Sequence, residues 1–215
     1  MGKRLVPLSG IVFAALAVVT IVVHGGNTPG ISATPSEVSA FYTSHHDRQS
    51  TASFLLALSV LFLAVFAAAL WRELTDDREE ALARLGGALT LLGAGVATAG
   101  YLVAAAVHLA LAEAVHHGIG PAGAQALNAI DAEDFQPFSI GTAIMLLGAA
   151  ALTVRRTDHW KWLGWIAALL GIAVFTPVGF FAYLGANVWI VVASIALAST
   201  SHMRPSVGPS RQGTT

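Results

Sequence analysis

The uncharged stretch at residues 85–112 constrains the fold more than any other feature. As an α-helix it would extend roughly 42 Å, which exceeds the ~30 Å hydrocarbon core of a bilayer. A carboxylate and two histidines follow directly, at Glu113, His116 and His117. We therefore expect a tilted transmembrane helix with a polar outer end, around which the other helices pack.

The composition agrees with a membrane protein, because 55% of the residues are hydrophobic and only 11% are charged. A typical soluble domain carries about 25% charged residues. The net charge of −1 argues against a nucleic-acid partner. The absence of cysteine excludes disulfides and thiolate sites, so any metal must be held by His, Asp or Glu. Arginine outnumbers lysine in an alanine-rich chain, which is typical of a bacterial protein.

Further apolar runs predict a single all-α domain over residues 1–200, with six transmembrane helices in contact with the lipid bilayer. The first is interpreted as an uncleaved helix, since its end lacks the small-x-small pattern of a signal-peptide cleavage site. A turn at residues 184–187 should separate the last two. The Ser-, Pro- and Gly-rich tail, residues 201–215, is predicted to be disordered. The expected spans are 5–23, 52–71, 85–112, 137–154, 162–183 and 188–200.

Two short helices are expected at the interface on the outer face. Thr34, followed by Pro35 and by Glu37 three positions on, is a helix-start signature that predicts a helix from Pro35 to about His45. Pro121 could start the second short helix, which should end at an acidic trio. That trio is Asp131, Glu133 and Asp134.

The basic residues set the predicted orientation. Six spans place both termini on one side of the membrane, and all but one of the 11 Lys and Arg residues fall on that side. Cytoplasmic loops carry such an excess, so both termini should be cytoplasmic and the protein should lie in the plasma membrane. Arg48 is the exception. The others are Lys3, Arg4, Arg72, Arg78, Arg84, Arg155, Arg156, Lys161, Arg204 and Arg211.

His108 is the first candidate functional residue, because ionisable groups inside a span are rare and face protein or water. Tyr101 lies seven residues earlier, on the same helix face, with Ala104 and Ala105 between them. These residues predict a shallow outer cavity that binds a small ligand, a lipid or a protein partner. The alternative is a neutral histidine that packs against another helix and donates to a Ser or Thr.

A metal site is the second candidate. Glu113 and His116 share one helix face, and His117 lies four residues from Glu113. The outer loop before the second span could supply the remaining ligands for zinc or another divalent ion, which would make the protein a metal-dependent membrane enzyme or a metal-handling protein. Simple solvation at a membrane surface is the competing interpretation. The candidate ligands are His45, His46, Asp47, Glu113, His116 and His117.

The glycine, proline and tryptophan residues predict how the helices pack and where they meet the membrane interface. Glycines in residues 85–112 should allow neighbouring helices to approach closely. Pro177 should kink the span at 162–183. Charge near the bilayer midplane is absent, which disfavours an ion-coupled transporter subunit. The glycines are Gly86, Gly87, Gly93, Gly95 and Gly100, and the expected interface anchors are Trp160, Trp162, Trp165 and Trp189.

Residues 35–154 resemble a group of small, uncharacterised multi-helix membrane proteins common in actinobacteria. The points of likeness are the lead SEVSAFYTSHHDRQSTASFLLAL, the charged loop after LWREL and the acidic lead DAEDFQPF. The resemblance implies the six-helix architecture and carries no established activity with it. A protein partner or a homo-oligomer is compatible with all these features.

Overall fold

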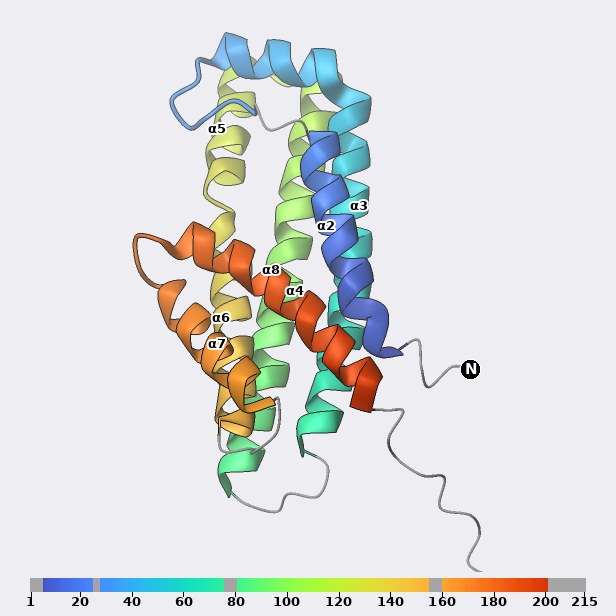
Figure 1. Cartoon of the computed structure of the whole chain (residues 1–215). Helices are drawn as coiled ribbons and strands as arrows, with labels where there is room; N and C mark the ends of the chain where they lie inside the picture. Colours follow the sequence, from blue (N-terminus) through green and yellow to red (C-terminus); the bar gives the residue numbers. More distant parts are fainter. Residues whose placement is uncertain (1–5, 25–27, 76–80, 155–159, 201–215) are drawn as a thin grey trace, which may run out of the picture.

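The computed structural model describes residues 6–24, 28–75, 81–154 and 160–200, and every regular element in this part of the chain is helical (Figure 1). The all-α prediction is therefore confirmed for the described residues. The elements are η1 (Val6–Leu8), α2 (Ser9–His24), α3 (Pro35–Thr75), α4 (Ala81–His116), α5 (Pro121–Ala132), α6 (Phe135–Thr153), α7 (Trp160–Ala173) and α8 (Gly179–Thr200).

Five of the described helical segments are long and apolar enough to cross a membrane. α7 is also apolar, but its 14 residues extend only about 21 Å. The structure therefore supports the prediction that several helices cross a membrane, but it does not confirm that there are six of them. The five segments are Val6–His24, Pro35–Thr75, Ala83–His116, Pro121–Thr153 and Gly179–Ser199.

The C-terminal helices divide at a different place from the predicted one. Residues 184–187, where a turn was expected, lie inside α8, and the chain turns at residues 174–178 instead. Pro177 explains the position of the turn, because proline lacks the amide hydrogen that helix continuation requires. Asn187 is accommodated in α8 because its side-chain amide donates to the Tyr183 carbonyl at 3.0 Å.

α3 joins the predicted short helix and the second span into one helix of 41 residues, kinked at His45. The predicted N-terminal signature is confirmed, since the Thr34 amide donates to Glu37 at 2.8 Å and the Glu37 amide donates to Thr34 Oγ1 at 3.4 Å. In Figure 1 the arm before the kink lies across one end of the bundle.

α5 begins at Pro121, as predicted, but it stands in line with α6 in Figure 1 and does not lie across the end of the bundle. Together with the arm of α3 and the C-terminal end of α4, it forms what we call the histidine-rich end. A small apolar core of Val38, Tyr42, Leu111 and Ala124 holds these elements together. η1 and the C-terminal end of α8 lie at the opposite end (Figure 1).

α4 and α6 pack with their backbones in close approach, as the glycines predict. Gly93 faces α6 so closely that a Cβ atom there would lie 2.1 Å from the Met145 nitrogen. Gly141 of α6 is equally close to the Ala97 nitrogen. Gly95 is different, since a Cβ atom on it would meet nothing within 4 Å. Small residues at such contacts are how helices associate in lipid.

Two of the four expected tryptophan anchors are core residues. Trp160 and Trp189 are buried, and the Trp189 indole donates to the Leu163 carbonyl at 2.9 Å. Trp162 and Trp165 are 73% and 56% exposed, which suits the predicted interface position. The predicted disordered tail and the basic residues at positions 3, 4, 78, 155, 156, 204 and 211 lie outside the described residues.

Candidate functional site

A partly open cavity of about 460 Å³ lies between the helices at the level where α2 ends. Tyr101 and His108, the two residues predicted to share a face of α4, both line it. Its walls come from α2, α3, α4, α6 and α8, together with the end of α5 and the loop before α3. A volume of this size is within the range of small-molecule sites.

Its described lining divides into a polar part and an apolar part, and contains no lysine or arginine. The polar residues are Thr20, His24, Thr28, Ser53, Tyr101, His108, Asp131, Asp134 and Tyr183; the apolar residues are Ala17, Ile21, Pro29, Gly30, Ala52, Leu56, Ala104, Ala132, Phe135, Phe138 and Phe180.

His108 is 5% exposed and is held by side chains from two other helices. Its Nε2 lies 2.8 Å from Gln49 Oε1 on α3, and its Nδ1 lies 3.0 Å from Asp131 Oδ1 on α5. Tyr42 donates to the other oxygen of Asp131 at 3.3 Å. In the alternative interpretation His108 would donate to a Ser or Thr, but the structure has an amide and a carboxylate in those positions.

Both ring nitrogens of His108 are hydrogen-bonded within the protein. Gln49 Nε2 donates to the His24 carbonyl at 3.1 Å, so the amide oxygen faces His108 and accepts from its Nε2–H. Nδ1 faces the Asp131 carboxylate on the other side of the ring.

The end of α2 is attached to α3 by the same group of residues. Arg48 donates from Nη2 to the Val22 carbonyl at 3.0 Å, and also from Nε to the Val23 carbonyl. Gln49 satisfies the carbonyl of His24. These bonds cap the last carbonyls of α2, which otherwise lack partners inside the helix. Arg48, the predicted outer-side exception among the basic residues, therefore has a structural role.

Several polar groups of the lining remain available to a ligand. The His24 ring stacks on His108 with centroids 4.3 Å apart, and no described residue hydrogen-bonds to its ring nitrogens. The half-buried Asp134 carboxylate likewise has no described hydrogen-bond partner, and Thr20 Oγ1 is buried without one. Buried polar groups are normally satisfied, so Thr20 in particular favours a polar occupant.

Aromatic rings form the apolar part of the cavity. Tyr101 stacks on Phe138 at 4.6 Å and its hydroxyl is hydrogen-bonded to that of Tyr183. Phe135 packs edge-on against Phe138 at 5.3 Å. Because one tyrosine hydroxyl donates to the other, a single O–H of the pair is left to donate elsewhere.

The predicted metal ligands form a second cluster at the histidine-rich end. Glu113 Oε1 lies 3.1 Å from His46 Nε2 and accepts from Ser50 at 3.2 Å, while its Oε2 lies 3.7 Å from His117 Nε2. The ring of His116 stacks on His46 with centroids 4.1 Å apart. The fold thus brings together two segments that are far apart in sequence.

Two of the predicted ligands are turned to other partners. Asp47 bonds to His46 Nδ1 at 3.0 Å, on the far side of that ring from Glu113. His45 Nδ1 lies 2.9 Å from the Phe41 carbonyl, and its ring stacks on Phe41. Within the described part of the chain, no three His, Asp or Glu side chains are arranged to hold a metal ion.

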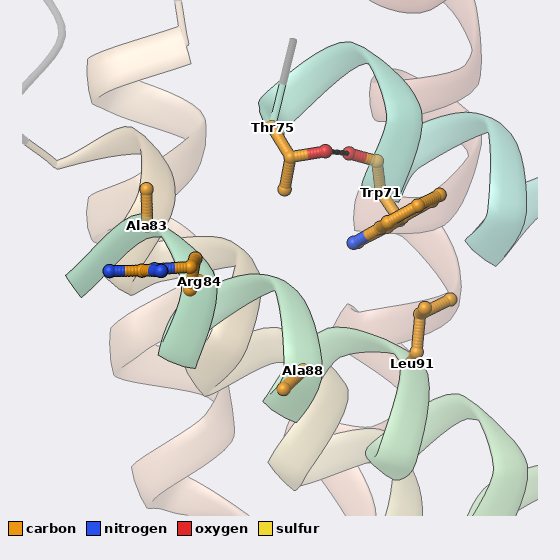
Figure 2. Close-up of a pocket in the computed structure, with 6 residues that line it drawn as sticks. All are labelled: Trp71, Thr75, Ala83, Arg84, Ala88 and Leu91. Carbon is orange, nitrogen blue, oxygen red and sulfur yellow. Dashed lines mark hydrogen bonds between the residues drawn. The ribbon is translucent and has the colours of Figure 1, made fainter. Parts of the chain in front are cut away.

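A further hollow of about 340 Å³ lies near the opposite end, between the C-terminal end of α3 and the N-terminal end of α4. Figure 2 shows the indole of Trp71 beside Leu91, with Thr75 donating to the Trp71 carbonyl at 2.8 Å. Arg84 is the one charged residue in the described part of its lining. None of the predicted site residues takes part in it.

Comparison with protein-family models, with curated proteins and with solved structures found no match. The site must therefore be interpreted from its own chemistry. Sequence reasoning missed Gln49 and Tyr42 as partners of the site and saw Asp131 only as the end of a short helix. Gln49 and Asp131 are 59 and 23 residues from His108, so no local spacing could have paired them.

Proposed function

We propose that the protein is a multi-pass plasma-membrane protein that binds a small amphipathic molecule in the cavity lined by Tyr101 and His108. The cavity itself carries the proposal, because it combines an aromatic part with polar atoms that have no described partner. Such a combination is typical of ligand sites, where apolar walls provide affinity and a few polar groups set orientation.

The proposed orientation has the histidine-rich end outside and both termini in the cytoplasm. Three of the four described Lys and Arg residues, Arg72, Arg84 and Lys161, support it, since they lie away from the histidine-rich end. The fourth, Arg48, is used to cap α2. In this orientation the ligand would enter from the outer half of the bilayer or from the outer solution.

Blocking the cavity should abolish binding. Ala17 lines the cavity from α2, whereas Ala15 of the same helix is exposed and lies outside the lining. We expect detergent-purified wild type and Ala15→Phe to bind at least one of three probes, 2-phenylethylamine, 2-phenylethanol or phenylacetate, and Ala17→Phe to bind none. Calorimetric titration measures this. Equal binding by both variants, or no binding of any probe to wild type, would contradict the proposal.

A divalent metal at the second cluster is the alternative proposal. It is favoured by one observation, that His46 and His117 lie on the two oxygens of Glu113 while His116 stacks on His46. The rings would have to rotate out of their stacked arrangement to bring their nitrogens to one ion. A bound metal ion would then support either hydrolytic chemistry or metal transfer at the outer face.

Metal content separates the two proposals. If the cluster holds a metal, tag-free protein dialysed against zinc should retain about one equivalent, and a His46→Ala, His117→Ala double variant should lose it. His159 is remote in sequence from the cluster, so His159→Ala serves as the control. Elemental analysis gives the result. The metal proposal fails if wild type and the double variant retain the same amount of zinc.

A further inference from the structure

We infer that the ligand of the cavity is an organic cation, a lipophilic primary amine, whose ammonium group is bound by Asp134. This inference rests on the proposed function, since it names the class of molecule that the same cavity takes. It depends on which charges in the lining are already compensated and which are not.

Only one carboxylate in the described lining has no hydrogen-bond partner. Asp131 accepts from Tyr42 and is hydrogen-bonded to His108 Nδ1, so it already has two partners. Asp134 has no such partner, and no Lys or Arg belongs to the described lining. The cavity therefore attracts a positive group and repels a carboxylate, because like charges at short range in a low dielectric are costly.

The remaining polar groups match the hydrogen-bond pattern of an ammonium. An ammonium has three donors and no acceptor. Asp134 can accept from it, as can a ring nitrogen of a neutral His24 and the Oγ1 atom of Thr20, which is 92% buried and lacks a partner. A neutral His24 is favoured because its ring is half-buried and stacks on the ring of His108, so a charge on it would be poorly solvated.

The aromatic part of the cavity suits the rest of the molecule. Phe135, Phe138 and Phe180 line it, and their ring faces attract cations as well as apolar groups. The aromatic or aliphatic part of the ligand would pack on these rings, and its amine would reach the polar residues. A neutral alcohol of the same size would pack on the same rings but would lack the charge that Asp134 attracts.

The test compares three probes of similar size but different charge: 2-phenylethylamine, 2-phenylethanol and phenylacetate. We expect wild-type protein in a neutral detergent at pH 7 to bind the amine at least tenfold more tightly than the alcohol, and to bind phenylacetate least. Asp134→Asn should weaken amine binding at least tenfold and leave the alcohol within twofold. Glu133→Gln, the exposed neighbour outside the cavity, should change neither.

The outcomes distinguish this inference from the proposed function. Equal affinity for the amine and the alcohol, or an unchanged amine affinity in Asp134→Asn, would overturn the inference that the ligand is an amine bound by Asp134. Either result would still leave the cavity as a ligand site. Failure of all three probes to bind wild type would overturn both. A thermal unfolding scan of each variant shows whether it is folded, and Asp134→Asn should unfold within a few degrees of wild type.

Discussion

Asp131→Ala should lower the free energy of unfolding by about 3 kcal/mol, because it leaves the buried Nδ1 of His108 without its hydrogen-bond partner. The side chains of His108 and Asp131 are only 7% and 11% exposed, so water cannot replace the lost partner fully. The same substitution releases the Tyr42 hydroxyl. Tryptophan fluorescence during denaturation with sodium dodecyl sulfate measures the loss.

A double-variant cycle tests whether the two residues act as a pair. Asp131→Ala combined with His108→Leu should cost clearly less than the sum of the single changes, because the second change removes the unpaired group. Glu113→Ala is the control, since its bond to His46 is partly exposed and should contribute little to stability. Additive effects at 131 and 108 would show that the pair is not coupled.

Gly93→Ala should be among the most damaging single-methyl additions, costing about 2–3 kcal/mol, because its Cβ would lie 2.1 Å from the Met145 backbone. Backbone cannot rotate away as a side chain can, so α4 and α6 would have to separate. Gly95→Ala, two residues on, should be neutral or stabilising by up to about 1 kcal/mol, because the site is open and alanine favours the helix.

The same unfolding measurement, applied to both glycine variants, checks this contrast. The two substitutions add the same atom to the same helix, so helix propensity changes equally in both. A difference between them therefore reports the contact between α4 and α6. Equal stability of the two variants would mean that the helices do not pack as described.

Local patterns allowed several features to be predicted from the sequence. The Thr34–Glu37 signature formed as expected, and the predicted end of the short helix near His45 coincides with the kink of α3. The same-face relation of Tyr101 and His108 holds because a seven-residue spacing is nearly two helical turns. Each of these follows from residues close together in the chain.

Features that depend on distant residues could not be predicted. Gly93 and Gly95 look alike in sequence, and only the position of α6 distinguishes them. Trp160 and Trp162 likewise cannot be told apart from their sequence context, yet Trp160 is buried and Trp162 is 73% exposed. The cavity itself needed side chains from α2, α3, α4, α6 and α8 to be placed around one point, which no spacing along the chain encodes.

Photolabelling tests the central claim, that the cavity holds a small amphipathic molecule, most directly. Analogues of 2-phenylethanol and 2-phenylethylamine with a ring diazirine would be irradiated with the purified protein, and the labelled residues identified by mass spectrometry. Phe180 and its neighbour Phe181 are 56% and 72% exposed, but only Phe180 belongs to the lining of the cavity. We predict labels on Phe135, Phe138 and Phe180 that excess unlabelled probe removes. Labels confined to Phe181 and other outward-facing residues, unaffected by competitor, would contradict the account.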